Sequence, residues 1–335
     1  MRRRLEHIVL SRPDSIGDVM LTLPMAGLLK ERYPGTRITF IGRRYTAPVL
    51  ERCVHVDRVL TVEDLAEGDA PAVLRSLGAD ALVHVFPHRS VARWARAAGI
   101  PMRIGTSHRW WHWTTCTHRV SFSRRRSDLH EAQLNTLLLR PLGPGDPPTL
   151  PELASLTGYR VPPASLVPAD LLATAGRTVV LHPGSQGSAV EWGFGNYAAL
   201  MRLLHAGGVR TVVTGTATEA ERYRPHLPWD HARAVDAGGR LSLEQLMALI
   251  GSAQALVAAS TGPLHLAAAS GIRAVGLFAP RRPIHPGRWA PLGRDAHALV
   301  YDPACVACAA GRPCDCITRI APARVAALLA APPVR

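Results

Sequence analysis

The stretch Arg12-Pro-Asp-Ser-Ile-Gly-Asp-Val-Met-Leu-Thr-Leu-Pro24 decides the fold, because it joins an apolar run to a helical pattern. The apolar run at residues 8–10 precedes it, so the order is strand, polar turn and helix start. In an open α/β sheet, ligands bind outside the carboxyl ends of the strands. A carboxylate on this turn is therefore expected to face a ligand, and Asp18 is the candidate, beside Asp14, Ser15 and Gly17. The alternative is that one of these polar side chains only caps the helix.

A second turn of the same kind lies far downstream, where the strand at residues 255–260 leads into Thr261-Gly262-Pro263-Leu264-His265. Proline suits the first positions of a helix, and Ser260 or Thr261 can cap it. Free N–H groups at such an end bind phosphate or diphosphate, and the His265 ring could add a contact.

A third turn, His182-Pro-Gly-Ser-Gln-Gly-Ser188, follows an apolar strand at residues 178–181. Its small residues allow a ligand to approach the backbone. Together, the three turns predict a cleft that binds a nucleotide diphosphate.

Apolar strands alternate with longer helical patterns along the chain, which predicts an α/β fold with parallel sheets. The first-domain strands are expected near residues 7–11, 37–41, 56–60, 81–86 and 101–104, and a helix at 128–140. The predicted parts are an N-terminal domain at 1–150, a proline- and glycine-rich linker at 151–176, a C-terminal domain at 177–317, and a last segment at 318–335. This last segment contains a helix that is expected to pack back on the first domain.

Several ordered motifs resemble those of glycosyltransferase family 9, whose best-known members are the ADP-heptose:lipopolysaccharide heptosyltransferases. The resemblance covers nearly the whole chain and implies the GT-B fold, with two Rossmann-like parallel-sheet domains facing a cleft. The matching segments are residues 14–24, His182-Pro-Gly-Ser with Glu191-Trp192, Gly215 with Glu219, Leu241-Ser242-Leu243, and residues 261–269.

The resemblance implies a role for each matching residue. Asp18 would be the general base that deprotonates the acceptor hydroxyl, which then displaces the nucleoside diphosphate with inversion and without a catalytic metal. The diphosphate would bind to Ser185 and to the turn formed by Thr261, Gly262, Pro263, Leu264 and His265. Glu219 would face the ribose of the donor, and Leu241 would lie near the nucleobase of the donor.

Two positions depart from the family pattern. Val190 stands where many relatives have a phosphate-binding lysine, and Lys30 is the only lysine in the chain. Ser260 replaces the usual aspartate before Thr-Gly. Arginine would then have to neutralise the diphosphate, and the candidates are Arg281, Arg282 and Arg288. The alternative is that these arginines are solvated loop residues.

The net charge of +14 over 335 residues raises the question of nucleic-acid binding. We discount it, because the bias toward arginine and alanine is typical of a GC-rich coding sequence and no nucleic-acid-binding motif is present. An anionic membrane leaflet or a phosphorylated lipid-linked glycan is the expected partner. No apolar run reaches about 20 residues, and the first residues pass into a predicted strand without an apolar signal region or a cleavage site. We therefore expect a cytoplasmic protein, with a peripheral contact at the inner membrane.

Aromatic and basic residues concentrate in His108-Arg-Trp-Trp-His-Trp113, which holds three of the 7 tryptophans. Aromatic side chains favour membrane boundaries and stack against sugar rings. Trp110 and Trp111 are therefore candidates for the acceptor side or for membrane contact. The alternative is that the tryptophans belong to the core of the first domain.

Four of the 6 cysteines, Cys305, Cys308, Cys314 and Cys316, form a C-x2-C-x5-C-x-C cluster. Four thiolates could hold a structural zinc or iron ion, and some protein-modifying heptosyltransferases resemble this chain in having an iron-bound C-terminal cysteine motif. The alternative is reduced thiols or a disulfide.

Taken together, these features predict an inverting GT-B transferase that uses a nucleotide-diphosphate sugar, ADP-heptose being expected. The expected acceptor is a lipopolysaccharide core or a related surface glycan. Two alternatives remain: the same fold glycosylating a protein or a small natural product, and an inactive GT-B scaffold that binds a nucleotide or a partner.

Overall fold

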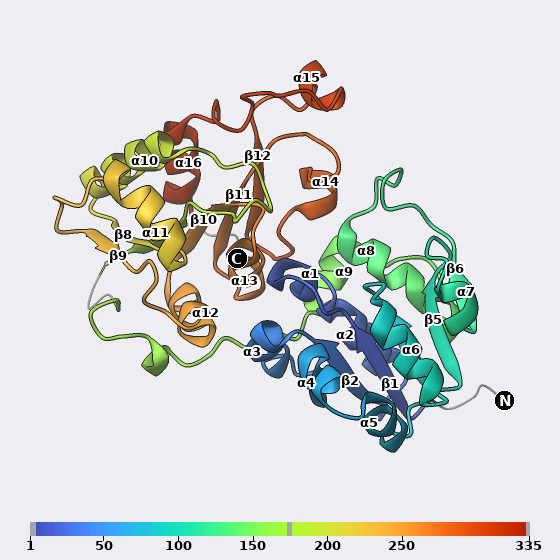
Figure 1. Ribbon diagram of the computed structural model, residues 1–335. Helices are drawn as coiled ribbons and strands as arrows, with labels where there is room; N and C mark the ends of the chain where they lie inside the picture. Colours follow the sequence, from blue (N-terminus) through green and yellow to red (C-terminus); the bar gives the residue numbers. More distant parts are fainter. Residues whose placement is uncertain (1–4, 173–175, 333–335) are drawn as a thin grey trace. The chain divides into compact units, whose positions relative to one another are not determined.

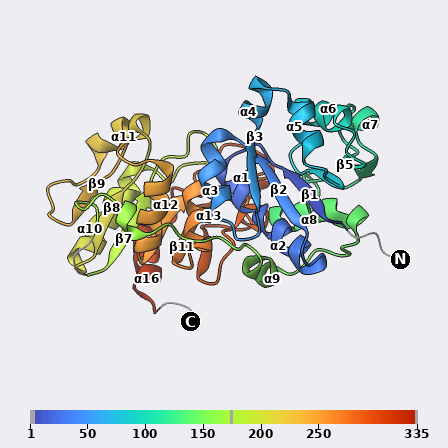
Figure 2. The same cartoon turned by 90° about the horizontal axis from the view of Figure 1, so that it is seen from below.

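The computed structural model describes residues 5–172 and 176–332 and divides into two compact units, Met1–Arg160 and Val161–Arg335. Each unit contains one six-stranded sheet whose strands are all parallel (Figure 1). Helices cover both faces of the first sheet, with α5 and α6 on one side and α2 and α9 on the other (Figure 2). The strands therefore read as apolar runs, as is usual when both faces of a sheet are buried.

The first sheet has the order β3-β2-β1-β4-β5-β6. Its strands are β1 (His7–Ser11), β2 (Arg37–Gly42), β3 (Arg58–Thr61), β4 (Ala81–His84), β5 (Met102–Thr106) and β6 (His118–Val120). The helices of this unit are α1 (Ile16–Met20), α2 (Leu23–Arg32), α3 (Ala47–Glu51), α4 (Val62–Glu67), α5 (Ala70–Ser76), α6 (Arg89–Ala97), α7 (His112–Thr115), α8 (Glu131–Thr136) and α9 (Leu150–Ser155), with 3-10 turns η1 (Arg44–Thr46) and η2 (Leu137–Leu142).

The second sheet has the order β12-β11-β10-β7-β8-β9. Its strands are β7 (Thr178–His182), β8 (Arg210–Val213), β9 (Ala234–Asp236), β10 (Ala255–Ala259), β11 (Arg273–Phe278) and β12 (Ala296–Val300). The helices are α10 (Phe194–Ala206), α11 (Ala217–Tyr223), α12 (Leu243–Ser252), α13 (Gly262–Ala269), α14 (Pro286–Trp289), α15 (Val306–Ala309) and α16 (Pro322–Ala330), with 3-10 turns η3 (Ala164–Leu166) and η4 (Arg224–His226).

Both sheets reverse their strand order once. In the first sheet the reversal lies between β1 and β4, and in the second between β7 and β10. Open α/β sheets bind ligands outside the carboxyl ends of the strands that flank such a reversal. The three turns singled out from the sequence follow β1, β7 and β10, so all of them lie at these positions.

The chain differs from the sequence-based expectations at several places. The sequence did not show β6, which is short and carries two exposed residues, His118 and Arg119. The helix expected at 128–140 is α8, capped by His130, followed by a 3-10 turn that contains Pro141. The expected linker at 151–176 begins inside α9, which belongs to the first unit; the two units meet at Arg160 and Val161.

The last helix, α16, was expected to pack back on the first domain, but its apolar side is buried in the core of the second unit. Val325 and Leu329 are at most 1% exposed and belong to the cluster that includes α10. Arg273 caps the end of α16 by donating to the carbonyl oxygens of Leu328 and Ala331, at 2.7 and 2.6 Å. Figure 1 shows α10 and α16 side by side. No helix in the described ranges has the length and apolar character needed to cross a bilayer.

Candidate functional site

The turn after β1 places Asp18 in the first turn of the short helix α1. Its carboxylate accepts a hydrogen bond from the Ser15 hydroxyl at 2.5 Å and pairs with the guanidinium of Arg12. The Ser15 side chain caps no backbone N–H of α1, and the Asp14 carboxylate accepts from the N–H of Ser15 at 2.9 Å. The Asp18 carboxylate is 16% exposed, so it keeps access to solvent while two side chains orient it.

Arg12 is a buried cation among three carboxylates. Its side chain is 5% exposed and lies 3.5 Å from both Asp14 and Glu131, in addition to its pair with Asp18. Burial works to lower the pKa of Arg12, but the charges of Asp18 and Glu131 outweigh it and raise that pKa above its usual value. Burial and the neighbouring Asp18 charge also raise the pKa of Asp14.

A second layer fixes this cluster to the body of the first unit. Glu131 is fully buried and also accepts from Arg124 Nε at 3.0 Å. Arg124 donates to Asn135 Oδ1 at 2.8 Å, and Asn135 in turn donates to the carbonyl oxygen of Leu21 at 3.1 Å. The base candidate is thus held by α8, more than a hundred residues away in the chain. A buried cation left without such carboxylates would be strongly destabilising.

The turn after β10 opens α13 as expected from the sequence. Thr261 is the N-cap residue and Pro263 stands in the first turn. The Thr261 hydroxyl caps no backbone N–H, and within the described part of the chain its buried oxygen has no hydrogen-bond partner. A buried hydroxyl without a partner is uncommon in proteins and points to a ligand or water at this turn. The first N–H groups of α13 add the partial positive charge of a helix start.

A cavity of about 330 Å³ lies beside this turn in the second unit. The structure brings together there four residues singled out from the sequence: Val190, Ser260, Arg281 and Arg282. Apolar side chains from the end of β11 and from residues 283–284 form much of the remaining wall. The cavity therefore offers two cationic side chains and a hydroxyl on an otherwise apolar surface. Such a surface could bind a ligand that has an anionic group attached to a less polar part.

The turn after β7 is closely packed against α11. Ser185 donates from its N–H to Glu191 at 3.1 Å, and its hydroxyl donates to the Ala189 carbonyl oxygen at 2.9 Å. Glu219 is buried and accepts from the N–H and hydroxyl of Thr216 at 2.8 and 3.0 Å, which closes a capping box at the start of α11. A side chain at Gly184 would meet the Glu219 carboxylate, so glycine is required there.

The other candidate ligand-binding residues of the second unit are less accessible to a ligand. The side chains of Leu264 and His265 are buried, at 0% and 4% exposure. Leu264 packs toward β11 at Gly276, so only its backbone could meet a ligand. Leu241 is half-buried just before α12. Burial lowers the pKa of His182, although the Glu219 charge works in the opposite direction.

The aromatic residues near position 110 form a largely exposed surface in the first unit. Trp110 is 65% exposed and Trp113 is 61% exposed, so neither belongs to the core. The guanidinium of Arg89 lies 5.1 Å from the ring centre of Trp110, and that of Arg119 lies 4.5 Å from Trp113. Trp111 is half-buried, with its ring edge against Trp110. The basic residues therefore cover aromatic faces that would otherwise be open to water.

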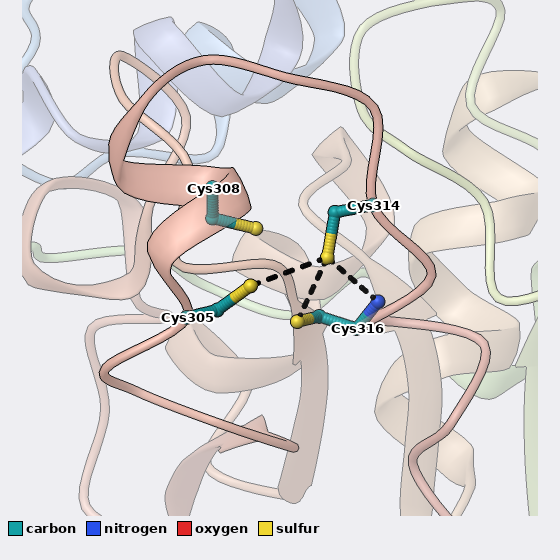
Figure 3. A group of neighbouring side chains, drawn as sticks. All are labelled: Cys305, Cys308, Cys314 and Cys316. Atoms are coloured by element: carbon teal, nitrogen blue, oxygen red, sulfur yellow. Dashed lines mark hydrogen bonds between the residues drawn. The ribbon is translucent and has the colours of Figure 1, made fainter.

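The four C-terminal cysteines converge in space (Figure 3). Their sulfur atoms all lie within 4.8 Å of one another, with 3.4 Å between Cys305 and Cys314 and 2.9 Å between Cys314 and Cys316. Tetrahedral coordination by four thiolates at about 2.3 Å would place the sulfur atoms roughly 3.8 Å apart. Hydrogen bonds from the backbone of Cys308 and from neighbouring thiols lower the pKa of Cys305 to about 7. The cluster could therefore bind a metal ion.

The sequence did not identify Arg12 and Glu131 as parts of the site. Arg12 begins the stretch that decides the fold, and an arginine next to two aspartates was an available signal. Glu131 carries no local signal, because its contact with Arg12 spans 119 residues and depends on the packing of α8.

The profile of glycosyltransferase family 9 (heptosyltransferase) matches residues 74–314. A Haemophilus influenzae protein with a provisional description as a glycosyltransferase is 27% identical over 317 residues, 90% of this chain and 90% of that protein. Lipopolysaccharide heptosyltransferase 3 of Escherichia coli is 24% identical and aligns over 78% of this chain and 80% of its own. The structure of E. coli ADP-heptose lps heptosyltransferase II superposes with a TM-score of 0.75 at 22% identity, covering 96% of this chain and 98% of that one.

Proposed function

The chain belongs to glycosyltransferase family 9, and from that premise we propose that it is an inverting, metal-independent sugar transferase. The donor is a nucleotide-diphosphate sugar, and ADP-heptose is the first choice because a solved relative carries that donor in its name. The acceptor is the core of lipopolysaccharide or a related surface glycan, on the strength of two relatives named for lipopolysaccharide.

The chemistry follows from the turn after β1. Asp18 takes the proton of the acceptor hydroxyl, and the oxygen attacks the anomeric carbon on the face opposite the diphosphate. The bond from that carbon to the diphosphate oxygen breaks, and the leaving group keeps the electron pair. Arg12 and Ser15 hold the Asp18 carboxylate in one orientation for this transfer. General-base help of this kind is typically worth about 10² to 10⁴ in rate.

The observation that carries the donor assignment is the buried Thr261 hydroxyl at the start of α13, which has no hydrogen-bond partner among the described residues. Charge develops on the diphosphate as the bond breaks, and fixed N–H and O–H dipoles at that position stabilise it. Arg281 and Arg282 of the neighbouring cavity supply the positive charge that the lysine of other family members would give. Ser185 also contacts the diphosphate, Glu219 faces the ribose, and Leu241 lies near the nucleobase.

Thr261→Val tests this assignment, because valine keeps the shape of threonine and removes only the hydroxyl. No hydrogen bond of the described protein is lost, so we expect unchanged thermal stability. The affinity for ADP should fall about tenfold, since hydrogen bonds to charged groups are the stronger ones. Calorimetric titration of wild type with ADP, UDP and GDP, followed by the same titration of the variant, gives the answer. If none of the nucleotides binds, the inactive scaffold with another partner is the better account; if ADP binds both forms equally, the Thr261 assignment is wrong.

The exposed tryptophans fit an acceptor that is embedded in a membrane. We propose that Trp110, with Trp111 and Trp113 beside it, contacts the glycolipid at the cytoplasmic face of the inner membrane. Aromatic rings suit the boundary between water and lipid, and the arginines over them suit phosphate.

The double variant Trp110→Ala/Trp113→Ala should bind vesicles of anionic phospholipid more weakly and raise the KM for a glycolipid acceptor. Both side chains are exposed, so stability and ADP affinity should not change. Leu203→Ala, an exposed apolar residue of the second unit, is the control. Unchanged vesicle binding and unchanged KM would rule out this surface, and transfer to a soluble protein or small molecule alone would favour the alternative acceptors.

The four-cysteine cluster is proposed to hold one structural zinc or iron ion. The ion would contact neither the donor nor the acceptor directly, and its ligands would be the sulfur atoms of Cys305, Cys308, Cys314 and Cys316. Two of these residues are buried and two are half-buried, so the ion would be largely enclosed by protein.

A further inference from the structure

The loop that carries the four cysteines also forms part of the wall of the 330 Å³ cavity. Ile317 follows Cys316 directly and lines this cavity. On the other side of the loop, Gly311 lies between Cys308 and Cys314, and its carbonyl oxygen accepts a hydrogen bond from Arg281 at 2.9 Å. Arg281 is itself a lining residue of the cavity. The cysteine loop and the cavity therefore share a wall and one hydrogen-bonded arginine.

The two ends of the loop are held differently by the protein. After Cys316, the chain is fixed to the region of α10, because Trp192 donates to the Ile320 carbonyl oxygen at 2.9 Å and Asn196 donates to that of Thr318 at 2.7 Å. By contrast, the five residues 309–313 are all exposed. Within the described ranges, their backbone N–H groups bond only to carbonyl oxygens of residues 305–308, in α15 and its N-cap. Segments with few buried apolar contacts open at low free-energy cost.

We propose that a metal ion bound by the four cysteines fixes residues 309–313 and so positions Arg281 in the cavity, which makes diphosphate binding dependent on metal occupancy. The ion acts at a distance, through the Gly311 carbonyl oxygen and the Arg281 side chain. Arg281 is exposed and would otherwise sample many rotamers, so its ordering before the ligand arrives reduces the entropy lost on binding. This inference rests on the proposed function, because it assumes that the cavity receives part of a nucleotide-diphosphate donor.

The first measurement is metal content. Protein produced in medium with equal zinc and iron should carry one equivalent of metal per chain, measured by mass spectrometry of the elements. Cys308→Ser/Cys316→Ser should lose it, whereas Cys116→Ala, a buried cysteine of the first unit, should keep it. Absence of stoichiometric metal in the wild type would overturn the proposal.

The second measurement is calorimetric titration with ADP. Wild type should bind ADP about tenfold more weakly after removal of the metal by a chelator, and reloading should restore the affinity. Arg281→Gln should keep the metal and bind ADP weakly in both states, so that metal removal has no further effect. The effects of metal removal and of Arg281→Gln on ADP affinity would then not add, as is expected for two groups that act together.

The outcomes separate the two proposals. If metal-loaded and metal-free wild type bind ADP equally, the coupling is wrong and the proposed function stands. A further fall in affinity when metal is removed from Arg281→Gln would show that the ion acts by another route and would overturn the role of Arg281. If ADP binds neither form, the proposed function fails and the coupling with it. Reversible loading of the wild type keeps the test independent of whether the cysteine variants fold.

Discussion

At the scale of single residues, the base candidate depends on a buried cation. Asp18 could have been a helix cap, but its carboxylate lies against Arg12 and the Ser15 hydroxyl. Arg12 meets Glu131, which is fully buried. Replacing a buried pair as a whole is often harmless, whereas removing one member leaves a charge without compensation. The network is therefore expected to be sensitive to single substitutions.

Glu131→Gln should destabilise the first unit. The substitution keeps the shape of the side chain but removes the negative charge shared by Arg12 and Arg124. Breaking a buried ion pair in this way costs about 3 kcal/mol or more, which urea denaturation will detect. Glu67→Gln, which breaks the exposed ion pair with Arg44, is the matched control and should leave the urea midpoint of unfolding unchanged. An equal midpoint for both variants would show that the Arg12 cluster contributes nothing to stability.

Local sequence signals allowed prediction of Asp18 and of the Thr261 turn, because each follows an apolar strand directly. Arg281 and Arg282, chosen because they follow an apolar strand, lie just beyond β11 and line the cavity, and their role as phosphate ligands stays a prediction. The partner Glu131 could not be predicted in this way. Its position next to Arg12 is a consequence of tertiary packing.

At the scale of elements, the edge strand β3 was predicted, but the edge strand β6 was not. Strand β6 has only three residues, and two of them are exposed, so it carries almost no apolar signal. Helix α16 was recognised as a helix, and its apolar side packs with α10 in the core of the second unit. Its apolar side could have covered either unit, and only the structure shows Val325 and Leu329 in the core with α10.

The turn between β7 and α10 gives a prediction at this scale. A Cβ atom added at Gly184 would lie 2.2 Å from an oxygen of the Glu219 carboxylate, which must then leave its place in the capping box of α11. Gly184→Ala should therefore lower the free energy of unfolding by about 1–3 kcal/mol, as overpacking does. It should also weaken ADP binding, if Glu219 faces the ribose. Urea denaturation measures the free energy of unfolding, and calorimetric titration measures the ADP affinity.

Gly195→Ala in α10 is the control, because nothing lies within 4 Å of the added atom. Alanine favours helices over glycine, so this variant should lose no stability. If Gly184→Ala behaves like Gly195→Ala in both measurements, the packing of Glu219 against the β7 turn has no part in nucleotide binding.

At the scale of the whole molecule, the two units repeat one architecture, and in the proposed function they divide the chemistry between them. Each has a six-stranded parallel sheet with one reversal of strand order. The reversal of the first sheet carries the proposed base, and that of the second carries the proposed donor turn. The fold class could be predicted from the order of strands, turns and helices along the chain, whereas the division of the chemistry stays a prediction. The cavity next to Ser260 could not, because its wall combines residues from 187 to 317.

Asp18→Asn tests directly whether Asp18 is the general base and the second unit alone binds the nucleotide. The variant keeps the side-chain size and leaves the charge of Glu131 beside Arg12. Wild type and variant are titrated with ADP, and transfer from ADP-heptose to extracted glycolipid is followed by product mass. We expect equal ADP affinity, a lower thermal stability because the buried Arg12 loses one of its paired charges, and a transfer rate lower by about 10² to 10⁴. Transfer at the wild-type rate by Asp18→Asn would contradict the account, because the proposed base would then not be the base.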